Sequence, residues 1–240
     1  MLDVVVKQSL LALAYHRLRP LLPLFISGIV VYVVETLFSR NSEQAEKELL
    51  MTCLTRGDVV LEIGGRTGNS TKTISRIVRE GRVYSLEPNP FSFQILSFAT
   101  RGIPNTRVFN LAASDKEGKD VMWFNFSGEG ESSFLKGKAT RSISVNLVTV
   151  DSFIDRVHER LFDAMVIDVE GHELHVLKGA RRVLENVRVL IVEVHHYTGS
   201  GLQSRIEDYV SQYGLKLNKC IEEEPSRISV CLWERRVLQA

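Results

Sequence analysis

The stretch that decides the fold is residues 57–71, which read GDVVLEIGGRTGNST. A short apolar run at 59–61 leads to the acidic Glu62, and a glycine-rich turn follows it. The Asn-Ser-Thr triplet at 69–71 favours the start of a helix, and apolar residues recur from Ile74 with the i, i+3, i+4 spacing of a helix face. The segment therefore predicts a strand, a tight turn and a helix, the opening unit of a nucleotide-binding α/β domain.

The glycine turn does not match the G-x-G-x-x-G fingerprint of dinucleotide-binding domains. Counted from Gly64, that fingerprint needs glycines where this chain has Arg66 and Asn69. The second glycine lets backbone approach a pyrophosphate, and an arginine side chain obstructs that approach. S-adenosylmethionine has no pyrophosphate. Its amino-acid end needs an acceptor for an ammonium and nearby backbone for a carboxylate, which Glu62 and the turn can supply.

A second strand pattern, YSLE at 84–87, also ends in an acid, Glu87. A carboxylate at the end of this strand can accept hydrogen bonds from both ribose hydroxyls of a bound nucleoside. The two patterns together favour an S-adenosylmethionine site over a dinucleotide site.

Length and composition indicate one domain with an extension. The chain has 240 residues, of which 44% are hydrophobic, enough for a sizeable core. Lys and Arg number 30 against 29 Asp and Glu, so the net charge of +1 gives no electrostatic reason to expect a nucleic-acid partner. We expect the folded domain to occupy residues 41–240.

The three cysteines, Cys53, Cys220 and Cys231, are widely spaced and form no CxxC pair. This pattern predicts thiols of a reducing, cytoplasmic compartment rather than a disulfide framework or a zinc site.

The extension, residues 1–40, contains an uncharged apolar run at 20–34. The run is shorter than the ~20 residues of a spanning helix, and Pro20 and Pro23 interrupt its start. Three interpretations stay open: a helix packed on the domain, a membrane-surface or short spanning anchor formed by residues 17–38, and an uncleaved signal-like segment. The last is the poorest, because no small-residue cleavage site precedes a polar mature start.

Further patterns predict the remaining elements. A helix is expected at 42–55, and another after Pro90 with Phe91, Ile95, Phe98 and Ala99 along its core face. Strands are expected at 106–111, 121–126 and 143–148, around a Gly- and Ser-rich loop at 127–138. A helix at 201–213 and a hairpin of strands 215–221 and 228–233 close the chain.

A second informative stretch is residues 162–180, FDAMVIDVEGHELHVLKGA. A buried-strand run at 164–167 is followed by Asp168, Glu170 and His172. Because ligands of open α/β sheets bind at the carboxyl ends of the strands, these side chains are expected in the same crevice as Glu62 and Glu87.

The next strand, at 187–194, carries Glu193 in an apolar run, where a carboxylate requires a partner. His195 lies two residues further and would point to the same side. We expect His195 to act as the proton acceptor and Asp168 to orient a substrate or a metal, while His172 is a weaker base because it opens a helix. For each acid alone, a helix cap or a loop ion pair is the simpler interpretation, but five polar groups that converge at two strand ends favour a functional site.

The order of these motifs resembles the FkbM-type methyltransferases across residues 57 to about 196. The matching pieces are VVLEIGGRTGNST, YSLEPNP, NLAASDKEG, ESSF, VTVDSF, VIDVEGHELHVLKGA and IVEVHH. The resemblance implies that Glu62, Gly64 and Gly68 hold the methionine part of S-adenosylmethionine, that Glu87 holds the ribose, and that residues 113–115 lie near adenine. It also implies O-methylation of hydroxyls on sugars or polyketides. Glu62 stands where the family more often has Asp, and Arg66 where it often has Asn.

The prediction is therefore a class I methyltransferase with a Rossmann-like α/β fold. We expect a mostly parallel seven-stranded sheet with helices on both faces and a C-terminal antiparallel hairpin. The candidate cofactor-binding residues are Glu62, Gly64, Gly65, Gly68, Ser70, Glu87, Ala113, Ser114, Asp115 and Asp168. The candidate catalytic residues are His195, Asp168, Glu170, Glu193 and His172.

Two rival functions stay open. One is an O-methyltransferase assisted by Mg²⁺, bound by Asp168 and neighbouring acids, although no metal site is expected. The other is a non-catalytic, membrane-tethered module that keeps the fold. The expected partner is a small-molecule or glycan hydroxyl acceptor.

Overall fold

The computed structural model describes residues 41–124, 132–135, 139, 141–198, 201–223 and 227–235. The extension at 1–40, with its apolar run, lies outside the described residues, as does most of the loop predicted at 127–138. Within the described ranges, no helix combines the length and the apolar character that crossing a membrane requires.

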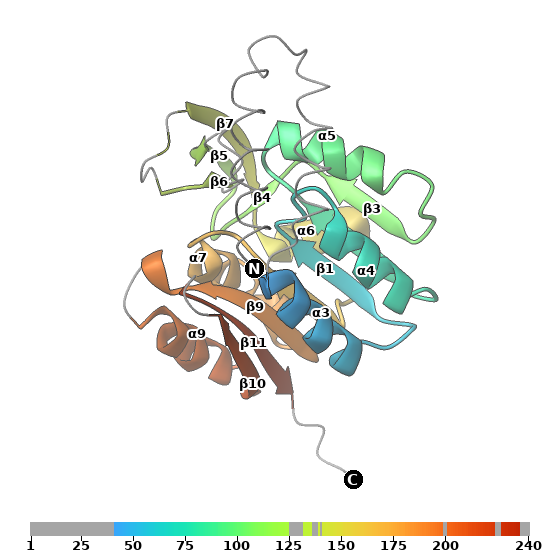
Figure 1. Ribbon diagram of the computed structural model, residues 1–240, viewed down its shortest axis with the longest axis vertical. Helices are drawn as coiled ribbons and strands as arrows, with labels where there is room; N and C mark the ends of the chain where they lie inside the picture. The colour runs from blue at the N-terminus through green and yellow to red at the C-terminus, as the bar shows by residue number, and fades with distance from the viewer. Residues whose placement is uncertain are drawn as a thin grey trace, which may run out of the picture.

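The centre of the molecule is a seven-stranded sheet with strand order β10-β11-β9-β8-β1-β2-β3 (Figure 1). Its strands are β1 (Val59–Ile63), β2 (Arg82–Leu86), β3 (Thr106–Phe109), β8 (Ala164–Ile167), β9 (Val189–His195), β10 (Leu215–Glu223) and β11 (Ile228–Arg235). Neighbouring strands from β3 to β9 are parallel, while β11 is antiparallel to both β9 and β10. The predicted sheet, with its C-terminal antiparallel hairpin, is confirmed.

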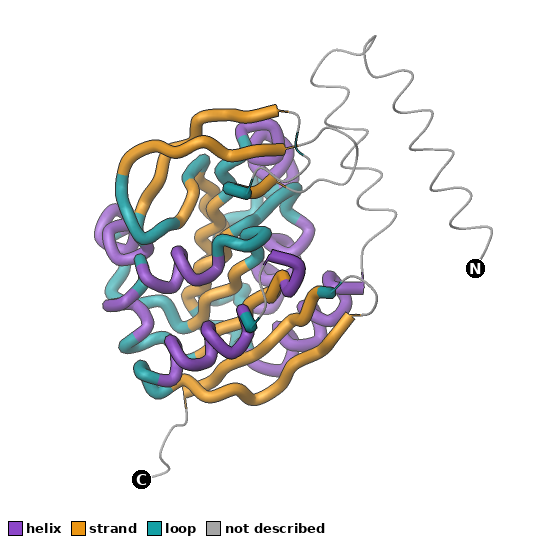
Figure 2. Tube along the Cα trace, turned by 90° about the vertical axis from the view of Figure 1, so that its left-hand side faces the viewer, coloured by secondary structure: helices purple, strands orange, loops and turns teal. Residues whose placement is uncertain are grey.

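Helices lie on both sides of this sheet (Figure 2). On one side are α3 (Asn41–Cys53) and α4 (Asn69–Ile77); on the other are α6 (Val150–Val157), α7 (Glu173–Lys178), α8 (Arg181–Leu184) and α9 (Leu202–Ser211). Helix α5 (Pro90–Ala99) follows β2, and the short 3-10 helix η2 (His196–Thr198) follows β9.

Alternate residues of the strands enter two separate cores, because successive side chains of a strand point to opposite faces. Val60 and its register partner Val83 pack in the core under α3 and α4. The next pair, Leu61 and Tyr84, packs under the helices of the other side. Both faces of the central strands are therefore covered, which explains their nearly continuous apolar sequence.

A second, smaller sheet of order β4-β7-β5-β6 lies beyond the carboxyl end of β1 (Figure 1). Its strands are β4 (Ala112–Ala113), β5 (Gly118–Phe124), β6 (Ser132–Ser133) and β7 (Arg141–Val148). The strands predicted at 121–126 and 143–148 correspond to β5 and β7, which pair antiparallel. That they form a sheet of their own was not predicted.

The predicted core face of α5 is wrong. Phe98 has an exposed fraction of 68%, whereas Leu96 is fully buried. Leu96 lies against the glycine turn, where a β-carbon added to Gly68 would be 3.0 Å from it. Because apolar residues occur on almost every side of this helix, their spacing did not identify the buried one.

The prediction of three thiols is wrong for two of the cysteines. Cys220 and Cys231 are directly opposite each other in the β10–β11 hairpin and form a disulfide, with their Cα atoms 4.1 Å apart. Cys53 is free and buried. The register of the hairpin brings the pair together, and register cannot be derived from the separation of the two cysteines alone.

Candidate active site

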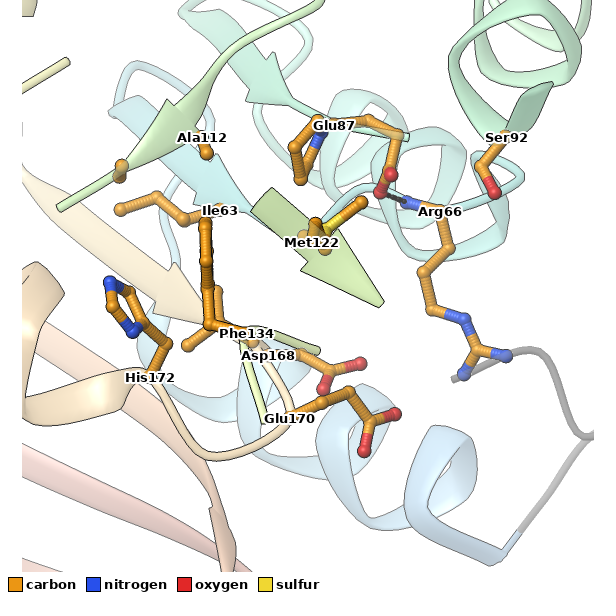
Figure 3. Close-up of a pocket in the computed structure, with 14 residues that line it drawn as sticks. Ile63, Arg66, Glu87, Ser92, Ala112, Met122, Phe134, Asp168, Glu170 and His172 are labelled. Carbon is orange, nitrogen blue, oxygen red and sulfur yellow. Dashed lines mark hydrogen bonds between the residues drawn. The ribbon is translucent and has the colours of Figure 1, made fainter. Parts of the chain in front are cut away.

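A pocket opens at the carboxyl ends of β1, β2 and β8, the edge at which ligands bind in open α/β sheets. The small sheet contributes Ala112, Ala113 and Met122, and Phe134 follows β6. The full lining is Ile63, Gly64, Arg66, Glu87, Pro88, Ser92, Ala112, Ala113, Met122, Phe134, Asp168, Val169, Glu170 and His172. The pocket is thus built from the main sheet on one side and the small sheet on the other (Figure 3).

The glycine turn is held by its own backbone amides. The N–H groups of Gly64 and Gly65 both donate to Leu86 O, at 2.9 and 3.1 Å, and that of Gly68 donates to Gly65 O at 2.8 Å. Because these three amides already donate to protein carbonyls, they are not available to bind an anion. A β-carbon at Gly64, which has φ +98°, would lie 1.8 Å from the carbonyl oxygen of Asp168. Glycine at 64 lets the ends of β1 and β8 approach each other.

Glu87 ends β2 and faces the pocket, with an exposed fraction of only 4%. One carboxylate oxygen accepts the N–H of Arg66 at 2.9 Å, and the other accepts the N–H of Asn89 at 2.8 Å. Two lone-pair positions remain for a ligand, since a carboxylate can accept about four hydrogen bonds. Burial raises the pKa of Glu87 to about 7, although both amide bonds act to lower it.

Glu62 is buried beneath the turn. Its Oε2 accepts hydrogen bonds from Thr71 Oγ1 at 2.5 Å and from Ser85 Oγ, which ties β1 to α4 and to β2. Burial raises its pKa above the ordinary value. Ser70, predicted to touch the cofactor, donates to Glu46 of α3 at 2.6 Å.

A second polar group lies where β4 ends. Ser114 Oγ is 3.0 Å from Nε2 of His172, and Asp115 is 2.9 Å from Nδ1 of His175. The His172 ring lies against Phe134, with ring centroids 4.3 Å apart. Burial lowers the pKa of His172 to about 4, so the ring is neutral at pH 7. A neutral His172 can orient a ligand but is a poor base.

Four carboxylates surround the imidazole of His195, which has no exposed surface. Nδ1 is 2.7 Å from Glu173 Oε1, while Nε2 is 3.2 Å from Glu170 Oε2 and 3.4 Å from Glu193 Oε1. Asp168 Oδ1 is 3.7 Å from the same Nε2. The expected convergence of these residues is therefore present, and it also includes Glu173, which the sequence did not single out.

The buried surroundings and the neighbouring carboxylates change the proton affinity of Asp168 and of His195. Burial, then the neighbouring Glu193 and Glu170, raise the pKa of Asp168 well above its ordinary value. Burial acts to lower the pKa of His195, but the carboxylates around the ring, Glu173 first, raise it well above the ordinary value. Tyr197 donates its hydroxyl to Glu170 Oε2 at 2.5 Å. The backbone of Glu170 is left-handed, with φ +50°, which turns its side chain toward the pocket.

The structure divides the predicted site residues into two groups. Those that line the pocket are Gly64, Glu87, Ala113, Asp168, Glu170 and His172. Those that are not part of its lining are Glu62, Gly65, Gly68, Ser70, Ser114, Asp115, Glu193 and His195. The roles assigned to both groups stay predictions.

Other lining residues were not predicted, among them Arg66, Ser92, Met122 and Phe134. Figure 3 shows the Arg66 side chain extending from the Glu87 side into the space that the carboxylates of Asp168 and Glu170 also face. The interruption of the dinucleotide fingerprint at Arg66 was a signal for this position. No local pattern places Met122 and Phe134 here, because the small sheet brings them in.

These residues fit S-adenosylmethionine. Glu87 has two free acceptor positions for ribose hydroxyls, and Ile63, Ala112 and Met122 provide apolar surface for an adenine ring. At the opposite end, Asp168 offers a carboxylate that lines the pocket and is 23% exposed, while its Oδ1 is buried toward His195. The exposed part of this carboxylate can accept a hydrogen bond from an ammonium group.

The sheet order, with its antiparallel last strand, defines the class I methyltransferase fold, and the acid after β2 lies at the edge of the pocket. The model of the methyltransferase FkbM domain matches residues 58–217. The chain belongs to the FkbM methyltransferase family.

Known proteins agree with this class. The chain is 27% identical over 158 residues to the hexuronic acid methyltransferase AglP of Haloferax volcanii; the match covers 65% of this chain and 63% of that relative's length. The crystal structure of methyltransferase FkbM from Methylobacillus flagellatus KT superposes with a TM-score of 0.55 at 18% identity, over 75% of this chain and 44% of that one. Aeropyrum pernix fibrillarin, solved with natively bound S-adenosyl-L-methionine, gives 0.50 at 14% identity, over 79% and 74%. These two structures share the fold.

Proposed function

We propose that this methyltransferase transfers the methyl group of S-adenosylmethionine to a hydroxyl oxygen of a sugar or glycan. The observation that carries the proposal is the pair of carboxylates, Asp168 and Glu170, that face the pocket across from the ribose-binding candidate Glu87. The similarity to a hexuronic acid methyltransferase supports a sugar as the acceptor class. S-adenosylmethionine, when bound, supplies an electrophilic methyl group on a sulfonium.

The residues of the chain would contribute to catalysis by holding the cofactor and the acceptor in place. Glu87 holds the ribose hydroxyls and so fixes the nucleoside end, while Asp168 orients the acceptor hydroxyl on the axis of the sulfur–methyl bond. Holding two reactants in line supplies much of the rate enhancement in a displacement of this kind. Phe134 and Met122 exclude water from the pocket on the side of the small sheet.

The acceptor proton is assigned to Glu170 rather than to His195. His195 has no exposed surface, and the carboxylates of Asp168 and Glu170 lie between its Nε2 and the pocket, so the ring cannot touch an acceptor hydroxyl in this arrangement. Oε2 of Glu170 is held by Tyr197, and Oε1 is buried without a hydrogen-bond partner among the described residues. Because Glu170 lines the pocket, its carboxylate is the group to which we assign the proton, and His195 positions the carboxylates around it.

Methyl transfer from labelled S-adenosylmethionine to a panel of free and lipid-linked glycans, including uronic acids, with polyketides alongside, tests the acceptor. We expect a methyl ether on a sugar, stable to mild alkali. A methyl ester, which mild alkali releases, would contradict the choice of a hydroxyl. Cofactor binding without transfer to any glycan would contradict the choice of a sugar.

Glu170→Gln tests the proton acceptor. Loss of a general base lowers turnover on the order of 10²–10⁴-fold, and we expect affinity for S-adenosylmethionine to stay unchanged. Glu222→Gln, an exchange of the same type on β10 outside the pocket lining, is the matched control. Near-normal turnover of Glu170→Gln would move the role to another group.

A further inference from the structure

We propose that Asp168, Glu193 and His195 form a binding site for a divalent transition-metal ion at the floor of the pocket. One ligand atom from each residue lies within 4.8 Å of the other two. His195 Nε2 is 3.4 Å from Glu193 Oε1 and 3.7 Å from Asp168 Oδ1. An octahedral ion with bonds of about 2.1 Å places neighbouring ligand atoms about 3 Å apart and opposite ones about 4.2 Å apart. Both of these distances lie between the two values.

The orientation of the His195 ring leaves Nε2 available to a cation when the ring is neutral. Nδ1 lies 2.7 Å from Glu173 Oε1, so in the neutral ring this nitrogen carries the proton and donates it to the carboxylate. Nε2 then presents its lone pair to the carboxylates of the cluster, and it has no hydrogen-bond partner in the part of the chain that the structure describes. Metal-bound histidines are commonly held in this way, with the second ring nitrogen donating to a carboxylate.

The negative charge of the four carboxylates also favours the binding of a cation. Asp168, Glu170, Glu173 and Glu193 surround one imidazole, and the last three are 6%, 0% and 8% exposed. Carboxylates buried together are costly unless they are paired or bound to a metal. Protonation of the ring offsets one negative charge, whereas a divalent ion offsets two.

The ligand atoms indicate the kind of ion. One imidazole nitrogen with two carboxylate oxygens suits Mn²⁺, Fe²⁺ or Zn²⁺ better than Mg²⁺, which prefers oxygen ligands alone. Glu170 Oε2, 3.2 Å from His195 Nε2, is close enough to join as a further oxygen ligand. Asp168 also lines the pocket, so an ion held by its carboxylate would lie beside the space for the acceptor.

The use of this site in catalysis rests on the proposed methyl transfer to a hydroxyl. Water has a pKa of about 15.7, an alcohol hydroxyl is similarly weak as an acid, and coordination to a divalent ion lowers that pKa by several units. The coordinated hydroxyl would lose its proton to Glu170. Its oxygen would then form a bond to the methyl carbon as the sulfur–carbon bond breaks, with that electron pair going to sulfur.

Direct binding of Mn²⁺ to the full chain, freed of metal with a chelator, tests the site without any acceptor. Electron paramagnetic resonance of unbound Mn²⁺ should show one tight site per chain, and Mn²⁺ should raise the melting temperature. His195→Ala should abolish both effects. Because a cavity at this buried position can unfold the protein, Glu193→Gln, which keeps the side-chain volume, should weaken binding by about 10–100-fold in a chain that still melts cooperatively.

His196→Ala is the matched control, because His196 follows His195 directly but contacts Ser229 instead, at 2.7 Å. It should bind Mn²⁺ as the unaltered chain does. Absence of binding by Mn²⁺, Zn²⁺ and Mg²⁺ would overturn the proposal, as would binding that Glu193→Gln and His195→Ala leave unchanged.

Measurements of methyl transfer test the metal site and the proposed function separately. Metal binding without transfer to any sugar would contradict the function and leave the site in place. Undiminished sugar methylation by metal-free protein would leave the function in place and overturn the use of the site in catalysis.

Discussion

The pH dependence of cofactor affinity should follow the Glu87 carboxylate. Burial raises its pKa to about 7, and the ionised form accepts hydrogen bonds from ribose hydroxyls. With a pKa of 7, the ionised fraction rises from roughly one tenth at pH 6 to roughly nine tenths at pH 8. If only the ionised form binds, the affinity for S-adenosylmethionine rises about tenfold over this range, or about 1.4 kcal/mol.

The stability of the cofactor-free protein should change in the opposite direction. The pKa of Glu87 lies above its ordinary value of 4.5, so the folded protein holds this proton more tightly than the unfolded chain. Its contribution to the free energy of unfolding is complete below pH 4.5 and is lost as the pH rises through 7. The difference between the two pKa values corresponds to at most roughly 3 kcal/mol.

Calorimetric titration with S-adenosylmethionine at pH 6, 7 and 8, with urea unfolding at the same pH values, measures both trends. Glu87→Ala should weaken binding by roughly 1–3 kcal/mol at pH 8, because the ribose hydroxyls lose their acceptor, and should flatten both pH profiles. Glu80→Ala, on an exposed side chain, is the control. Equal affinity at pH 6 and pH 8, or an unchanged affinity in Glu87→Ala, would refute the role of Glu87.

Two further predictions concern the turn and the hairpin. Gly64→Ala should lower the melting temperature and weaken S-adenosylmethionine binding at least roughly tenfold. The added β-carbon would meet the Asp168 carbonyl, and the backbone of Gly64 is left-handed. Gly57→Ala is the control and should change neither property, because a β-carbon at Gly57 would have no atom within 4 Å. Normal binding by Gly64→Ala would contradict the close approach of β1 and β8. Reduction of Cys220–Cys231 with dithiothreitol should lower the free energy of unfolding by about 2–3 kcal/mol for this short loop, with cofactor affinity intact. Urea unfolding of Cys220→Ala, which should not respond to dithiothreitol, checks this assignment.

Local patterns were sufficient for the main sheet. The acid and glycines after β1, the acid after β2 and the polar residues after β8 each follow a buried strand, and parallel strands bring their carboxyl ends to one edge. That is why Glu87, Asp168 and Glu170 could be placed in one pocket from the sequence.

The burial of individual side chains and the pairing of residues distant in the sequence could not be predicted from local patterns. His195 belongs to the correct cluster, but its burial depends on η2 and α7, which the local pattern of β9 does not specify. Glu173 looked like an ordinary helix residue, and only tertiary packing brings its carboxylate to the ring. The disulfide follows from a hairpin register with a shift between Leu217 and Lys219, which the sequence does not reveal.

The small sheet makes the enzyme modular. Among the described residues its strands pair only with one another, yet Ala112 and Met122 belong to the pocket wall opposite Asp168. The segment from β4 to β7 is continuous in the chain, so a change in its length or side chains alters one wall while the strands that carry Glu87 and Asp168 keep their register. New acceptor preferences can therefore evolve in this insert without a new cofactor site, and exchanging it between family members is a direct route to altered specificity.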